Sequence, residues 1–77
     1  MNFETVKTLK GDFVIILEET KDGAYLCIRP FGEQIIYAPT ELDFDSFSEY
    51  SEDDMRITLK QRQVLKEFFK DFDSIAA

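Results

Sequence analysis

Histidine and tryptophan are absent from this 77-residue sequence, and it contains a single cysteine, Cys27. Without histidine, the chain lacks the side chain that most often acts as a general acid or base near neutral pH and that commonly binds metals. The sequence also contains no nucleophile elbow, P-loop, dinucleotide fingerprint or zinc-ligand spacing. We therefore expect a protein that is not an enzyme and that has no cofactor or metal site.

A lone cysteine cannot form an internal disulfide, and Cys27 lies within an apolar run. No histidine or second nearby cysteine is present to lower the pKa of its thiol, so we expect a structural thiol and a reducing, cytoplasmic setting. The N-terminus lacks the apolar core of a signal peptide, and no run approaches the ~18 apolar residues of a membrane span. No membrane association is expected.

The size and composition indicate one folded domain over residues 1–77. A chain this short buries only about three-fifths of its unfolded surface, which leaves no room for a second domain. Hydrophobic residues make up 44% of the sequence, with eight Phe but only three Gly and two Pro. This composition is typical of a globule rather than of a disordered chain.

Basic residues are missing from the whole stretch between Arg29 and Arg56. The acidic residues of this stretch are Glu33, Glu41, Asp43, Asp45, Glu49, Glu52, Asp53 and Asp54. The rest of the chain has nine basic residues and the other eight of the sixteen acidic ones, a sum of plus one. The net charge of −7 is therefore a property of one segment. It disfavours direct binding to nucleic acid or to anionic membranes and favours a basic partner.

The most acidic part of this stretch is residues 40–54, which we call the acidic segment. Three strands are predicted before it. The run Phe13–Glu19 is apolar over five positions, which is typical of a central strand buried on both faces. Asp22 and Gly23 then predict a hairpin turn, after which the chain returns as a second strand that ends before Pro30. Residues 34–38 predict a third strand. Residues 2–10 suit either a short helix or a fourth strand, and we favour the strand.

A capping box formed by Thr58 and Gln61 predicts a helix from Leu59 to about Phe72. Its apolar side chains fall in one arc of about 140° at 100° per residue. These are Val64, Leu65, Phe68, Phe69 and Phe72, and a basic stripe of Arg62, Lys66 and Lys70 lies beside them. We expect an α+β domain, in which an antiparallel meander of three to four strands is covered on one face by this C-terminal helix. The acidic segment would be the crossover between them.

The residues 57–69, ITLKQRQVLKEFF, resemble the opening helix of LuxR-type or sigma-factor helix-turn-helix domains. That resemblance implies a following recognition helix. Since only eight residues follow, we do not expect such a domain here.

The residue pattern contains two candidate ligand sites. Asp43, Asp45 and Asp54 occupy positions one, three and twelve of a calcium-loop register, but Ser48 stands where the sharp turn needs glycine. No dedicated calcium site is expected. Aromatic and basic residues of the predicted sheet suggest a stacking face for nucleic acid, although aromatics in small sheets are more often core or cross-strand partners.

The acidic segment interleaves carboxylates with aromatic residues, and three interpretations remain open. In the first, the segment is a solvated loop whose aromatic residues lie under the helix and whose acidic residues pair with the basic stripe. In the second, it is a docking surface for a basic protein. In the third, it is a regulatory tether that is modified at Ser46, Ser48 or Ser51. In the docking hypothesis, carboxylates occupy the positions that phosphates would occupy, and aromatics act as anchors. In size and charge the chain is similar to DNA-mimicking inhibitors, including small phage proteins that block CRISPR or restriction complexes.

We therefore expect a binding protein that inhibits or regulates a larger basic partner, which in turn handles nucleic acid. The predicted partner-binding residues are Glu41, Asp43, Phe44, Asp45, Phe47, Glu49, Tyr50, Glu52, Asp53 and Asp54. The alternative is an assembly subunit or homodimer that associates through its sheet edge or its helix, with the acids serving solubility.

Overall fold

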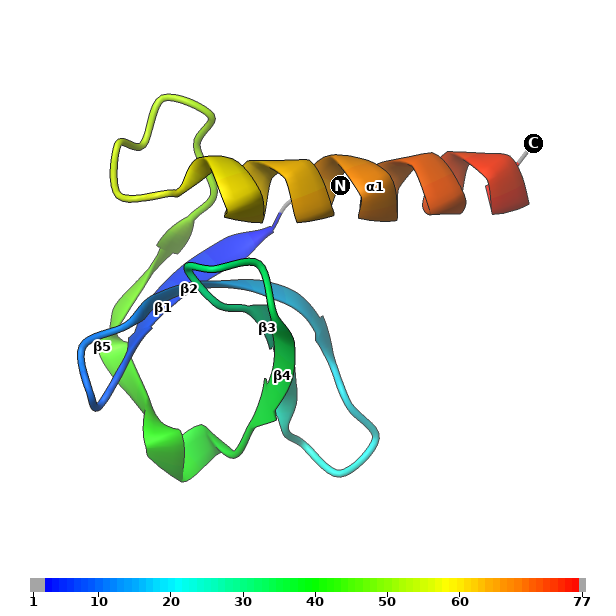
Figure 1. Ribbon diagram of the computed structural model, residues 1–77. Helices are drawn as coiled ribbons and strands as arrows, with labels where there is room; N and C mark the ends of the chain where they lie inside the picture. The colour runs from blue at the N-terminus through cyan, green and yellow to red at the C-terminus, as the bar shows by residue number, and fades with distance from the viewer. Residues whose placement is uncertain (1–2, 77) are drawn as a thin grey trace.

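The computed structural model describes the backbone of residues 3–76 and the side chains of residues 3–68. It consists of one antiparallel sheet followed by one helix, so the fold is α+β (Figure 1). The elements are β1 (Glu4–Thr8), β2 (Phe13–Glu19), β3 (Tyr25–Ile28), β4 (Gln34–Tyr37), the 3-10 helix η1 (Pro39–Glu41), β5 (Leu42–Glu49) and α1 (Leu59–Ala76). The N-terminal segment is a strand, as expected. The predicted number of three to four strands is wrong, because the acidic segment contributes a fifth.

The strand order in the sheet is β4-β3-β2-β1-β5. The first four strands form a meander, and β5 returns to pair antiparallel with β1. Strand β2 is central, and its residues from Phe13 to Leu17 are all buried. This confirms the prediction of a strand that is covered on both faces.

The predicted turns are present and depend on glycines with positive φ. Between β2 and β3, the Thr20 N–H donates to the carbonyl of Ala24 at 2.8 Å, and Gly23 has a φ of 83°. Between β3 and β4, Gly32 has a φ of 94°. A Cβ atom at Gly32 would lie 3.5 Å from the Cβ of Lys60, so this turn packs directly against the start of α1.

The sheet is strongly curled, as Figure 1 shows. Tyr25 in β3 and Phe47 in β5 have ring centroids only 6.2 Å apart, although two strands separate β3 from β5. Three inter-strand spacings in a flat sheet would keep these strands roughly 14 Å apart. The sheet is therefore an open barrel whose concave side brings distant strands together.

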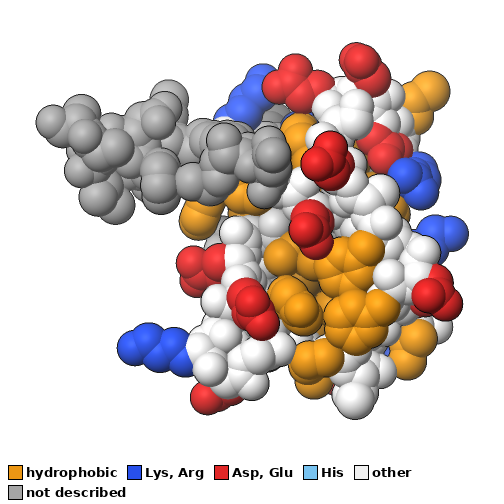
Figure 2. Space-filling view, turned by 180° about the vertical axis from the view of Figure 1, so that it is seen from behind, with side chains coloured by type: hydrophobic (Ala, Val, Ile, Leu, Met, Phe, Trp, Pro, Cys, Tyr) orange, Lys and Arg blue, Asp and Glu red, His pale blue; other side chains and the backbone are white. Residues whose placement is uncertain are grey.

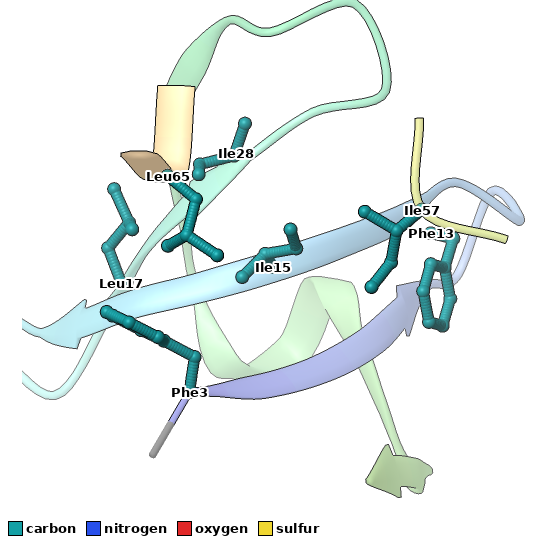
Figure 3. Packing of buried hydrophobic residues seen from close by; sticks show 7 residues of the cluster. All are labelled: Phe3, Phe13, Ile15, Leu17, Ile28, Ile57 and Leu65. Atoms are coloured by element: carbon teal, nitrogen blue, oxygen red, sulfur yellow. The ribbon is translucent and has the colours of Figure 1, made fainter. Parts of the chain in front are cut away.

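Two hydrophobic clusters lie on opposite faces of the sheet. The cluster beneath the helix consists of Phe3, Phe13, Ile15, Leu17, Ile28, Ile57 and Leu65 (Figure 3). The cluster inside the barrel consists of Val6, Val14, Ile16, Cys27 and Leu42. Strand β2 contributes to both, since successive side chains of a strand point to opposite faces.

The helix begins at the predicted capping box. The Thr58 N–H donates to Gln61 Oε1 at 2.9 Å, and the Gln61 N–H donates to Thr58 Oγ1 at 3.1 Å. Leu65 is buried, and Val64 and Phe68 pack against the cluster beneath the helix. The other two members of the predicted apolar arc, Phe69 and Phe72, and Lys70 of the basic stripe lie outside the described side chains.

Gln61 is a buried polar residue whose hydrogen bonds extend beyond the predicted capping box with Thr58. Its Nε2 also donates to the carbonyl oxygens of Phe13, at 2.8 Å, and Ile28, at 3.0 Å. The first turn of α1 is thus hydrogen-bonded to both β2 and β3.

Within residues 3–76, no helix is long and apolar enough to cross a membrane.

Candidate binding surface

The acidic segment does not form the expected crossover loop. Its first half is strand β5, which ends the sheet and pairs with β1 on one side, and only residues 50–58 connect the sheet to the helix. The correction has a physical reason. Leu42 belongs to the cluster inside the barrel, and Phe47 packs against it. These two apolar side chains of β5 therefore contribute to the core, whereas Asp45 and Glu49 are exposed.

Strand β5 contains a wide bulge opposite β1. Lys7 pairs with Asp43 and Thr5 pairs with Ser48, so two steps along β1 correspond to five along β5. Side chains replace the missing ladder bonds: Ser46 Oγ accepts from the Lys7 N–H at 2.8 Å and donates to the Asp43 carbonyl at 2.7 Å. The bulge breaks the simple alternation of the strand and carries Phe44 out to the surface.

Two phenylalanines of the bulge stack on each other. The rings of Phe44 and Phe47 are nearly parallel, at an interplanar angle of 7°, and their centroids are 5.2 Å apart. Tyr25 is tilted by 67° and 64° to them, at 6.4 Å and 6.2 Å. Because Tyr25 is almost equally distant from both parallel rings, it lies beside the stack. Tyr25 and Phe47 pack against the barrel cluster, and Phe44 stacks on the outside of Phe47.

Figure 2 shows hydrophobic side chains gathered over the curled sheet, with acidic side chains bordering them on several sides. Phe44 is 51% exposed, and Asp45 and Glu49 of the same strand are exposed. We call this set the aromatic-acidic surface. It consists of Tyr25, Asp43, Phe44, Asp45, Phe47 and Glu49.

Carboxylates outside the acidic segment extend this surface. Glu4 lies directly opposite Glu49 in the pairing of β1 with β5, and both are exposed. A shallow groove of about 330 Å³ beside Tyr25 is lined by Glu4 and Glu19. Neither Glu4 nor Glu19 is among the residues that the sequence predicts for partner binding. Their positions, at the first residue of β1 and the last residue of β2, show their proximity only once the strand register is known.

The structure divides the predicted partner-binding residues into three places. Those of β5 lie on the aromatic-acidic surface. Tyr50, Glu52, Asp53 and Asp54 lie in the loop before α1, where Tyr50 packs against the cluster beneath the helix. Glu41 lies apart from both groups, in a groove of about 380 Å³ that is also lined by Lys10 and Arg29.

One member of the loop group is already paired within the chain. The Arg56 Nη2 lies 2.8 Å from Asp54 Oδ2, and the Arg56 Nε donates to Asp54 Oδ1 at 3.0 Å. These hydrogen bonds from Arg56 lower the pKa of Asp54 to about 2. The same guanidinium lies 4.3 Å from the ring centroid of Phe13. Asp54 therefore belongs to an internal network.

Arg62, the first member of the predicted basic stripe, binds backbone rather than carboxylates. It donates to the carbonyl oxygens of Glu52 and, at 2.8 Å, of Asp54. Among the described side chains, the ion pairs are those of Arg29 with Asp12 and Glu33 and that of Arg56 with Asp54. The acids of β5 take part in none of them.

The remaining chemical groups occupy structural positions. Cys27 is buried inside the barrel, where burial raises the pKa of its thiol to about 12. Tyr25 and Tyr37 are paired directly across β3 and β4 and pack against the barrel cluster. In the described part of the chain, no group of three or more cysteine, aspartate or glutamate side chains is arranged to hold a metal ion.

No family model, curated protein or solved structure matches this chain. The observations that bear on its function are therefore those of the aromatic-acidic surface and the neighbouring loop.

Proposed function

We propose that this protein is a non-enzymatic binding protein that inhibits or regulates a larger basic protein, and that β5 and the following loop form its contact surface. The partner that suits it best handles nucleic acid, because a surface that binds phosphates is basic and also accepts carboxylates. In this hypothesis the protein competes with nucleic acid, as a DNA mimic does.

One observation carries the proposal. Asp45 and Glu49 are exposed on the same edge strand as Phe44, whose ring stacks on the half-buried Phe47. Among the described residues, no ion pair neutralises Asp45 or Glu49. Uncompensated like charges on neighbouring positions oppose folding, and they steer association with a molecule of the opposite sign. An aromatic centre bordered by charge also has the composition of a protein-protein hot spot.

A matched pair of charge reversals tests this proposal. The site variant combines Asp45→Lys, Glu49→Lys and Asp53→Lys. The control variant combines Glu18→Lys, Asp22→Lys and Glu67→Lys, which lie outside the surface and are also exposed. Both variants change the net charge by the same amount, so they separate a localised contact from bulk attraction.

The wild type and both variants are immobilised, exposed to a cell lysate, and any retained protein is purified for affinity measurements. We expect a basic partner whose affinity for the wild type falls as the salt concentration rises. Its affinity for the site variant should be at least tenfold lower than for the wild type, and its affinity for the control variant should stay within about threefold of the wild type. Equal affinity of the two variants would show that the surface is not the contact. Retention of the same partner at high salt would argue against an electrostatic interaction.

The second candidate is an assembly subunit, and it rests on the other edge of the sheet. Strand β4 ends the sheet opposite β5, and its Ile36 is 60% exposed. An apolar side chain on a free edge strand favours strand addition. If β4 pairs between copies, the purified wild type is a dimer by light scattering and Ile36→Lys is a monomer. A monomeric wild type at high concentration would exclude pairing of β4 between copies.

A further inference from the structure

We infer that the exposed face of Phe44 binds an arginine side chain of the basic partner, with the guanidinium stacked on the ring and paired with a carboxylate of β5. This inference rests on the proposed function and adds the chemical group that the surface recognises.

The arrangement of the aromatic rings leaves one face of Phe44 available. Phe47 stacks on one face at 5.2 Å, and Tyr25 lies beside the stack rather than on top of it. Phe44 remains 51% exposed, although the rings it touches are half-buried.

Carboxylates flank this ring on both sides in the sequence. The Asp43 Oδ1 accepts a hydrogen bond from the Asp45 N–H at 3.1 Å, which orients the Asp43 carboxylate. The Asp45 side chain is exposed and makes no hydrogen bond or ion pair with any described residue. An apolar partner would have to strip water from these charges, whereas a cation pairs with them.

The same molecule contains a complete example of this contact. The Arg56 guanidinium lies over the Phe13 ring at 4.3 Å and binds both carboxylate oxygens of Asp54. Phe44 and Asp45 provide the same two groups, an aromatic ring and a carboxylate, on the surface of β5. In the complex, the partner would supply the guanidinium.

Arginine suits this surface better than lysine. Its planar guanidinium stacks on an aromatic face and donates two parallel hydrogen bonds to a carboxylate, whereas the ammonium of lysine is compact and strongly hydrated. The surface should therefore distinguish two peptides of equal charge.

The test is a titration with two synthetic octapeptides, one with four arginines alternating with glycines and one with four lysines in their place. The protein variants are the wild type, Phe44→Leu and, as a matched control, Phe31→Leu, since Phe31 is also exposed, at 76%, and lies outside the surface. Affinity is measured at low salt. NMR follows the δ-methylene protons of arginine, which move upfield when they lie over an aromatic ring.

We expect the wild type to prefer the arginine peptide, with upfield shifts of its δ-methylene protons. Phe44→Leu should weaken binding of that peptide roughly 3- to 30-fold, which corresponds to a cation-π contact, and should abolish the upfield shifts. Phe31→Leu should stay within about twofold of the wild type.

Other outcomes would overturn the inference in distinguishable ways. If Phe44→Leu binds like the wild type while the triple charge reversal of β5 and its loop does not, the acids form the contact without Phe44. If the wild type binds both peptides equally and shows no upfield shift, arginine stacking is excluded, and the proposed function is then decided by the lysate experiment. If the triple charge reversal also binds both peptides like the wild type, the acidic surface itself is not the contact.

Discussion

The side-chain amide of Gln61 donates a 2.8 Å hydrogen bond to the carbonyl oxygen of Phe13, and Gln61 is completely buried. A second hydrogen bond from the same nitrogen reaches Ile28 in the neighbouring strand. Since a buried carbonyl without a donor is destabilising, these contacts fix the position of the helix on the sheet. Because the helix packs on the other face of the sheet, it does not cover the aromatic-acidic surface.

Replacing Gln61 with leucine should destabilise the protein by about 2–4 kcal/mol, because two buried carbonyl oxygens lose their donor and the capping box loses its acceptor. Chemical denaturation followed by circular dichroism measures the free energy of unfolding. Gln63→Leu, at an exposed position of the same helix, is the control and should change the stability by less than about 0.5 kcal/mol. Equal effects of the two substitutions would contradict the bridging role of Gln61.

The two stacked phenylalanines should differ in their contribution to stability. Phe47 packs against the barrel cluster, so Phe47→Ala should cost about 2–3 kcal/mol. Phe44 is exposed on one face, so Phe44→Ala should cost less than about 1 kcal/mol. Thermal unfolding of the two variants measures this difference. A larger loss for Phe44→Ala would mean that the outer ring belongs to the core and would weaken its assignment to binding.

The thiol of Cys27 should not react in the native protein. Burial raises its pKa from 9.0 to about 12, so the reactive thiolate is scarce at mildly alkaline pH, and the sulfur lies inside the barrel. We expect a disulfide reagent such as Ellman's reagent to modify Cys27 rapidly in concentrated urea and very slowly in buffer. Rapid modification of the native protein would show that the barrel opens readily.

The pairing of Asp54 with Arg56 makes an acid-dependent contribution to stability. The pKa of Asp54 is about 2 in the folded protein, below its ordinary value of 3.8, so the folded state holds the ionised carboxylate more strongly than the unfolded state does. The contribution is complete above about pH 4 and is lost as the pH falls towards 2.

Carboxyl-carbon NMR measures this pKa directly. Arg56→Gln should return the midpoint of Asp54 towards 3.8, because the hydrogen bonds from Arg56 are the main cause of the shift. An unchanged midpoint of Asp54 in the variant would show that another group lowers its pKa.

The sequence was most informative where local chemistry determines structure. The Asp22-Gly23 turn, the apolar run of β2 and the Thr58-Gln61 capping box each depend on neighbouring residues, and the structure contains all three. Alternation also holds along β3, where Ile28 lies in the cluster beneath the helix and Cys27 in the cluster inside the barrel. These features need no knowledge of distant parts of the chain.

Strand β5 was missed because its sequence has the composition of a loop. Aspartate and serine are rare in strands, and the bulge breaks the period of two after Phe44. The alternation of Leu42, Asp43 and Phe44 was the available signal, but charged residues on a strand make sense only once it is known to lie at the edge of the sheet. The predicted contact residues were also treated as one segment. In the structure, Glu41 lines a separate groove, and the strand register places Glu4 opposite Glu49.

The unpaired edge of β5 has a consequence for how the protein behaves at high concentration. A second copy that approached this edge with its own β5 would bring carboxylates against carboxylates, and the bulge would interrupt the ladder between the two strands. We therefore expect this edge to repel a second copy of itself at neutral pH. This protection depends on ionisation, so light scattering should detect self-association as the pH falls to the isoelectric point of about 4.4, and dispersed monomers again at neutral pH.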